Sequence, residues 1–292
     1  MPRFDYLRDP DEIERQSFVQ IRQITDLSRF DADQQQVAMR LVHTSGDPDI
    51  AHDLHFSTGA VAAGLAALEK GADVLCDIEM VSHGISKRYL HSPVLCFLNA
   101  PPVIDRARLA RKTRTMAAME EWPAHLTGSI VVIGNAPTAL FRLLELLDEG
   151  VSRPALVIGM PVGFINATES KQALWDTATT EFQTPCVTLL GRRGGSSLAA
   201  ATLNALARMA VARATRPKAM KPSVSPISRG NSYSAGRPSA QRPSRTMRSC
   251  SMRRRAASAA GWAAPWLSSM MRCRRCFVPA ILTPPASLIS AT

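Results

Sequence analysis

The stretch SIVVIGNAPTALFRLLELL, residues 129–147, decides the fold class. Residues 129–133 form a short, mainly apolar run that ends at a Gly-Asn pair, as a buried strand does. The residues after it carry apolar side chains at helical spacing, and a proline stands where that helix would begin. A buried strand that leads through a glycine turn into a helix is the repeating unit of a parallel α/β sheet.

The same alternation runs through residues 1–212. Strands are predicted at 73–78, 94–98, 129–133, 155–158 and 186–190. Helices are predicted at 10–26, 31–43, 57–70, 106–121, 136–149, 166–182 and 196–212. We therefore expect a single α/β domain with a mostly parallel sheet flanked by helices. A ligand of such a sheet lies beyond the carboxyl ends of its strands, which directs attention to the loops GNAP, GMPVGF and GRRGGSS.

Charge is distributed unevenly along the 292 residues, whose net charge is +11. Residues 213–292 hold 15 of the 35 Lys and Arg residues and none of the 24 Asp and Glu residues. Residues 1–212 therefore carry 20 basic against 24 acidic residues, a net charge of about −4. Because residues 213–292 are rich in Arg, Ser and Pro without a hydrophobic period, we expect them to be a disordered, low-complexity basic tail.

Two interpretations of this tail compete. It could be a nucleic-acid-binding arm, or a segment translated in the wrong frame from GC-rich DNA. We favour the second, because the tail mixes Arg, Ala, Pro and isolated Trp without a motif, and we expect no nucleic-acid partner. Salt-dependent DNA binding that is lost on truncation at Ala212 would support the first interpretation. Cys273 and Cys276 have C-x-x-C spacing, but without a second pair they indicate zinc only weakly.

The chain shows no sign of export or membrane insertion. Its first residues are charged and lack the apolar core of a signal peptide, and no run reaches the roughly 18 apolar residues of a membrane span. Cys76, Cys96 and Cys186 lie in apolar runs, where a free thiol behaves as a small hydrophobic side chain. We expect a cytoplasmic, soluble enzyme without a membrane partner.

His43 is the leading candidate for chemistry. It ends the predicted helix 31–43 and precedes the polar stretch TSGDPD. A helix carboxyl end favours a protonated imidazole, the side chain that titrates nearest neutral pH, so a histidine here is suited to general acid catalysis. A histidine that only caps its own helix is the alternative, which spacing alone favours. His52 and His55 could add metal ligands, but an H-x-x-H pair without a third ligand does not predict a metal site.

Other polar residues give weaker signals. Asp77 and Glu79 would share one face of a strand, where a structural role is the simpler interpretation. The GNAP and GRRGGSS turns could present backbone N–H groups to an anion or could be ordinary tight turns, and neither matches a nucleotide motif. Arg40 lies three positions before His43 and shares its helical face. Further basic clusters are Arg111, Lys112 and Arg114, and Arg192 with Arg193.

Five blocks of this sequence resemble one known family. They are RLVHTSGD at 40–47, DIEMVSHGI at 77–85, GNAPTALFRLLEL at 134–146, GMPVGFINATESKQAL at 159–174 and GRRGGSSLAAATLNALA at 191–207. In their order and spacing they resemble precorrin-8X methylmutase, also called precorrin isomerase. The resemblance implies a homodimeric α/β isomerase without a cofactor. It would move a methyl group between adjacent carbons of ring C and convert precorrin-8X, a tetrapyrrole, to hydrogenobyrinic acid in cobalamin biosynthesis.

The resemblance also implies roles for individual residues. His43 corresponds to the family's proton donor or acceptor, while Ser17 of ERQSF and Arg40 correspond to residues that contact substrate. Arg114 corresponds to a third such residue, although its turn reads RKTRT, with Lys112 in place of the family's asparagine. Two alternatives within the family remain: a cobalt-containing substrate, and a fold whose activity is lost because residues 213–292 obstruct dimerisation.

Overall fold

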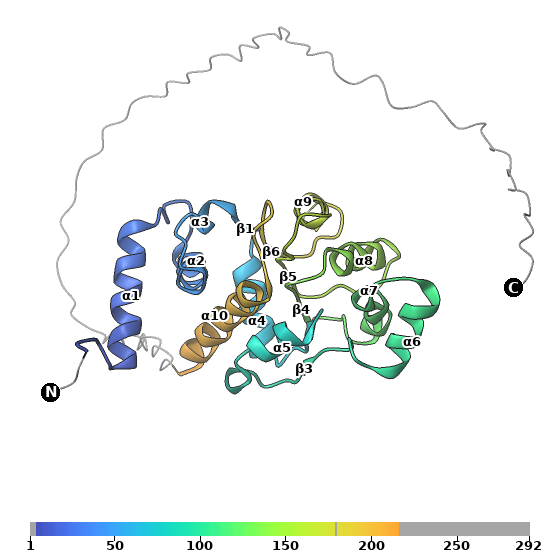
Figure 1. Ribbon diagram of the computed structural model, residues 1–292, viewed down its shortest axis with the longest axis horizontal. Helices are drawn as coiled ribbons and strands as arrows, with labels where there is room; N and C mark the ends of the chain where they lie inside the picture. Colours follow the sequence, from blue (N-terminus) through green and yellow to red (C-terminus); the bar gives the residue numbers. More distant parts are fainter. Residues whose placement is uncertain (1–3, 179, 216–292) are drawn as a thin grey trace, which may run out of the picture. The chain divides into compact units, whose positions relative to one another are not determined.

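Six strands form one sheet in the order β1-β6-β5-β4-β2-β3 (Figure 1). They are Leu54–Phe56 (β1), Val74–Cys76 (β2), Val94–Leu95 (β3), Ile130–Ile133 (β4), Leu156–Gly159 (β5) and Cys186–Leu189 (β6). Strands β2 to β6 are parallel, and only β1 pairs antiparallel, with β6. The computed structural model describes residues 4–178 and 180–215, all within the unit Met1–Ser223.

Helices cover both faces of this sheet, and strand residues alternate between two cores. Ile130 and Val132 of β4 contribute to one core, and Val131 and Ile133 to the other. On the first face lie α2 (Ala32–Ser45), α4 (Ala60–Glu69), α5 (Glu79–Gly84) and α10 (Ser196–Thr215). On the second lie η2 (Met119–Ala124), α8 (Pro137–Asp148) and α9 (Ala167–Ala178). Burial on both faces explains why β4 and β5, in the middle of the sheet, are apolar throughout.

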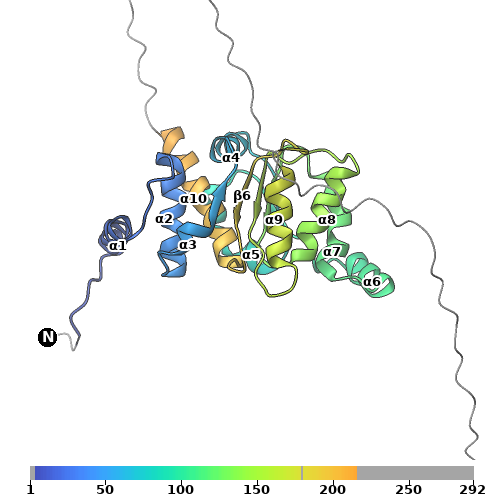
Figure 2. The ribbon, with the colours of Figure 1, turned by 90° about the horizontal axis from the view of Figure 1, so that it is seen from above.

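Helix α1 (Pro10–Ile24) is the outermost element of the first face (Figure 2). It packs against α2, and Ile21 is its one buried residue. Val19 and Ile24 stay exposed on it. The remaining short helices are α3 (Ile50–Asp53), η1 (Lys87–Tyr89), α6 (Pro101–Ala110) and α7 (Arg114–Ala118).

The predicted fold class, an α/β domain with a mostly parallel sheet, is confirmed, and each predicted strand overlaps an observed one. The single helix predicted over 106–121 is wrong. Arg111 adopts a left-handed conformation with φ of 51°, which ends α6. The Thr113 side chain then accepts a hydrogen bond from the Met116 N–H and starts α7 as a separate helix. Local backbone geometry therefore overrides the helical spacing of the side chains here.

The structure also differs from the prediction at other places. Strand β1, which the sequence did not predict, is only three residues long and owes its place to pairing with β6. Helix α10 continues to Thr215 and so takes in the first three residues of the predicted tail. The rest of that tail, with Cys273 and Cys276, lies outside the described residues.

Asp77 closes the GNAP turn from the neighbouring strand. Its carboxylate is 2% exposed and accepts hydrogen bonds from the N–H groups of Gly134 at 3.1 Å and of Asn135 and Ala136 at 2.9 Å each. Burial raises the pKa of Asp77, while the three N–H donors oppose this shift. The suggestion that this turn holds an external anion is thus wrong, because the chain's own carboxylate occupies it. The shared strand face of Asp77 and Glu79 is wrong too, since β2 ends at Cys76 and Glu79 begins α5.

Replacing Asp77 should destabilise the fold. Asp77→Ala leaves three N–H groups without their acceptor, and we expect the free energy of unfolding to fall by about 3 kcal/mol. Urea denaturation followed by circular dichroism measures this change. Asp105→Ala, at an exposed position of α6, is the control and should stay within about 0.5 kcal/mol of the unsubstituted protein. Equal stability of the two variants would contradict the role given to Asp77.

Candidate active site

His43 lies against an aromatic ring near the end of α2. Its imidazole stacks on Phe18 of α1, with ring centroids 5.6 Å apart and an interplanar angle of 15°. The Arg40 guanidinium carbon lies 4.6 Å from the centroid of the same Phe18 ring. Helix α2 continues past His43, and Gly46, in a left-handed conformation, closes it with an N–H bonded to Val42 O. The helix therefore has a cap other than His43, whose side chain is exposed to solvent.

A cavity of about 650 Å³ opens beside this stack, between α1, α2 and α10. Its volume lies within the roughly 300–1,000 Å³ typical of small-molecule sites. Four arginines but only two carboxylates line it, so its lining has a positive balance. The lining residues are Asp11, Glu14, Arg15, Phe18, Val19, Arg22, Gln23, Met39, Arg40 and Arg208.

One carboxylate joins three helices at this cavity. Glu14 of α1 accepts a hydrogen bond from Arg40 of α2 at 2.6 Å, and from Arg208 of α10 at 2.8 Å and 3.3 Å. Arg208, and then Arg40, hold the pKa of Glu14 down at about 2, so this carboxylate is ionised at neutral pH. Arg40 and Arg208 also line a second hollow, of about 310 Å³, with Arg88 and Tyr89.

Ser17 and His43 stand beside this cavity rather than in its lining as far as the described residues show. Ser17 directly precedes Phe18 on α1 and is half-buried. Phe18, the residue after Ser17 on α1, stacks on His43 and lines the cavity. Of the four predicted site residues, the structure thus brings Arg40 and His43 of α2 together at Phe18, and Ser17 lies on the adjoining helix α1.

Arg114 lies elsewhere. It begins α7, which packs against α6, η2 and α8 on the second face of the sheet, while α2 covers the first (Figures 1 and 2). Its guanidinium donates to Asn99 Oδ1 at 3.2 Å. Within one chain, therefore, the sheet separates Arg114 from His43.

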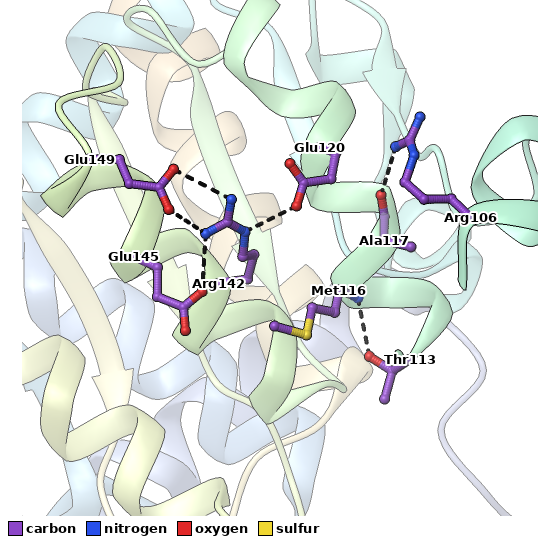
Figure 3. Close-up of polar contacts among 8 residues, drawn as sticks. All are labelled: Arg106, Thr113, Met116, Ala117, Glu120, Arg142, Glu145 and Glu149. Carbon is purple, nitrogen blue, oxygen red and sulfur yellow. Dashed lines mark hydrogen bonds and ion pairs between the residues drawn. The ribbon is translucent and has the colours of Figure 1, made fainter. Parts of the chain in front are cut away.

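Polar contacts hold the α7 region in place (Figure 3). Arg106 of α6 donates to the Ala117 carbonyl at 3.2 Å. Arg142 of α8, with only 13% of its side chain exposed, binds Glu120 at 3.2 Å, Glu145 at 3.1 Å and Glu149 at 2.7 Å. These three carboxylates raise the pKa of Arg142, and the bond to Glu120 ties η2 to α8.

The loops at the carboxyl ends of β5 and β6 pack on each other. Gly194 lies so close to the backbone of residues 160 and 161 that a side chain would not fit, and the Gly195 N–H donates to the Met160 carbonyl at 2.8 Å. This second glycine turn is thus closed by backbone contacts, and its Gly195 N–H is not available to an anion. Phe164 is 88% exposed, and the Arg192 guanidinium carbon lies 5.7 Å from its ring centroid.

Lys171 and Arg193 connect these loops to the segment after His43. Arg193 pairs with Asp47 at 3.1 Å and Asp53 at 3.5 Å. The side chain of Lys171 is fully buried and its ammonium donates to the Arg193 carbonyl at 2.5 Å. Burial lowers the pKa of Lys171 to about 8, and the charge of Asp53 opposes this shift.

Sequence reasoning missed four residues of this region: Glu14, Phe18, Arg208 and Lys171. Glu14 and Phe18 are four residues apart on a predicted helix, which was a signal that they share one face with Ser17 nearby. Nothing in the local sequence distinguishes Arg208 or Lys171 from exposed basic residues.

The histidine pair His52 and His55 is not a helical pair. His55 lies on β1, where its Nδ1 is 3.0 Å from the Asp53 carbonyl oxygen and its ring meets Trp175 edge-on at 5.2 Å. Over the described ranges, no three His, Cys, Asp or Glu side chains gather in a way that could hold a metal ion. None of the helices described there is both long and apolar enough to cross a membrane.

The buried ammonium of Lys171 predicts a pH effect on stability. The pKa of Lys171 is about 8 in the folded protein, whereas that of a free lysine is 10.5. Between pH 8 and pH 10.5, therefore, this lysine is mostly protonated in the unfolded chain and mostly deprotonated in the folded one. The free energy of unfolding should therefore rise by up to about 3 kcal/mol from pH 8 to 10.5, relative to a Lys171→Met variant. Urea unfolding across this range measures the difference. Lys70→Met, at an exposed lysine, should keep the rise, and a rise that persists in Lys171→Met would refute the assignment.

Comparison with known proteins gives consistent matches. Residues 12–209 match the family model described as precorrin-8X methylmutase. The precorrin-8X methylmutase of Pseudomonas aeruginosa is 49% identical over 205 residues, which cover 70% of this chain and 97% of that protein. The cobalt-precorrin-8 methylmutase of Methanothermobacter thermautotrophicus is 39% identical over 197 residues, which cover 67% of this chain and 91% of that protein. A crystal structure of precorrin-8X methyl mutase from Thermus thermophilus superposes with a TM-score of 0.62 at 37% identity, covering 69% of this chain and 98% of that one.

Proposed function

Because this chain belongs to the precorrin-8X methylmutase family of isomerases, we propose that it catalyses the methyl shift that converts precorrin-8X to hydrogenobyrinic acid in cobalamin biosynthesis. The observation that carries the proposal within this chain is the stack of His43 on Phe18, beside Arg40 and an arginine-lined cavity. An imidazole, a flat aromatic surface and guanidinium groups together suit a planar polycarboxylate such as a tetrapyrrole.

The reaction is an isomerisation, so no atom or electron is gained or lost. One carbon–carbon bond to the methyl group breaks, and another forms at the adjacent ring carbon. The protein has to hold the macrocycle still and exchange a proton with a ring nitrogen or a conjugated carbon. In this proposal His43 exchanges that proton, while Arg40 pairs with a peripheral carboxylate and Ser17 donates a hydrogen bond nearby.

His43→Ala tests the central role. The variant should lose about 10²- to 10⁴-fold in kcat, the contribution that one general acid or base makes, and should keep its fold because the side chain is exposed. Absorbance spectroscopy follows the conversion of precorrin-8X. His91→Ala, which removes another exposed histidine, should leave kcat unchanged. Turnover by His43→Ala at the unsubstituted rate would refute the assignment.

We also propose that two copies form a homodimer in which Arg114 of one copy serves the site of the other. Arg114 can serve the same substrate as His43 only from a second copy, since the sheet lies between them in one chain. Phe164 and Ile165, 88% and 81% exposed, supply apolar surface suited to such an interface.

We propose a cytoplasmic location for the protein. The free cysteines Cys76, Cys96 and Cys186 are consistent with it.

Mixing two inactive variants tests the shared site. His43→Ala and Arg114→Ala should each be nearly inactive, whereas a mixture that exchanges subunits should recover about a quarter of full activity, because half of the dimers contain one intact site. Native mass spectrometry checks that mixed dimers form. Mixed dimers without activity would mean that Arg114 does not act across the interface.

For the substrate we propose the metal-free ring rather than the cobalt complex. In support, the relative from Pseudomonas aeruginosa, named for precorrin-8X, is 49% identical, and the archaeal relative, named for cobalt-precorrin-8, is 39% identical. Elemental analysis of the pigment that co-purifies with the protein separates the two, because cobalt in stoichiometric amount would favour the complex.

A further inference from the structure

The Glu14 carboxylate is held by arginines in the way that a carboxylate of a bound ligand would be. Two guanidiniums from different helices, Arg40 of α2 and Arg208 of α10, converge on this single carboxylate of α1. The contact with Arg208 is two-pronged, with Nη1 on Oε1 and Nη2 on Oε2. This is the geometry in which arginine recognises any free carboxylate, including a carboxylate of a small molecule.

The surroundings of this cluster are those of a site rather than of a surface ion pair. Both arginines line the cavity of about 650 Å³, and both also line the hollow of about 310 Å³. Arg40 extends over Phe18, the ring on which His43 stacks, and so connects the cluster to the proposed acid–base residue.

Glu14 is accessible from solvent, so another carboxylate can reach the two arginines. Its side chain is 34% exposed, and that of Arg208 is 43% exposed. Helix α1, which carries Glu14, buries only Ile21 and packs mainly on α2. A carboxylate of a ligand that bound to both guanidiniums would therefore displace Glu14 without disrupting the core.

We propose that Arg208, together with Arg40, binds a peripheral carboxylate of the tetrapyrrole, and that Glu14 holds this place until the substrate displaces it. The inference rests on the proposed function for the identity of the ligand. Glu14 then acts as an internal competitor that keeps both guanidiniums oriented and makes the site selective for ligands that supply a carboxylate of their own.

Binding of hydrogenobyrinic acid, the product of the proposed reaction, tests this inference by fluorescence or absorbance titration. Arg208→Gln should raise its Kd on the order of ten- to a hundredfold, as loss of a charged hydrogen-bonding partner does. The Kd of Arg208→Lys should lie between those of the unsubstituted protein and Arg208→Gln, because lysine keeps the charge but loses the two-pronged contact. Glu14→Gln should lower the Kd several-fold, because the competitor loses its charge. In the Arg208→Gln background the gain from Glu14→Gln should shrink, since the two residues act on one position.

Arg153→Gln, at an exposed arginine between α8 and β5, controls for a general loss of positive charge and should leave the Kd unchanged. If the ion pairs of Glu14 were only structural, Glu14→Gln and Arg208→Gln would both lower the midpoint of unfolding and change the Kd by less than twofold. That result would overturn the inference. If the unsubstituted protein failed to bind hydrogenobyrinic acid, the proposed function would fail and this inference with it. Binding by the unsubstituted protein that Arg208→Gln does not weaken would overturn the inference alone.

Discussion

The central strands of this protein are buried on both faces, and this constraint arranges everything else. A sheet of that kind needs helices on each side, and the βα units supply them with α4, α5 and α10 on one face and α8 and α9 on the other. Helices α1 and α2 precede these units and add a further layer against α10. The candidate site forms in that added layer, between α1, α2 and α10, and not in the loops at the carboxyl ends of the strands.

Those loops are the usual ligand site of a parallel sheet, but here the chain itself closes two of their turns. The carboxylate of Asp77 occupies the N–H groups of the turn after β4, and backbone contacts close the turn after β6. The groups that remain to bind an anionic ligand near His43 are therefore side chains, above all arginines. Several of these arginines pair with internal carboxylates, and in the cluster of Glu14, Arg40 and Arg208 the Arg40 guanidinium also lies over Phe18, the ring on which His43 stacks.

Local patterns were enough to predict most of the elements. Apolar runs with glycine or proline at their ends predicted five of the six strands that the structure describes. A strand that is buried on both faces is apolar along its whole length, so its own sequence is enough to identify it. They could not mark β1, three residues long, or the break at Arg111, where a left-handed residue and the Thr113 cap outweigh helical spacing. For the site, RLVHTSGD led to His43 and Arg40 through the family resemblance, whereas no pattern led to Arg208, which is 168 residues from Arg40 in the chain.

The amino-acid sequence by itself determined the α/β class, the βα order and the family to which the chain belongs, since all of these depend on short-range periodicity or on motifs that are continuous in the chain. Only the tertiary structure decided which charged groups meet. It joined Glu14 to Arg208 across 194 residues, stacked His43 on Phe18, and placed Arg114 beyond the sheet. The physical reason is that contacts between side chains depend on how helices pack over the sheet, which the periodicity of any one helix does not specify.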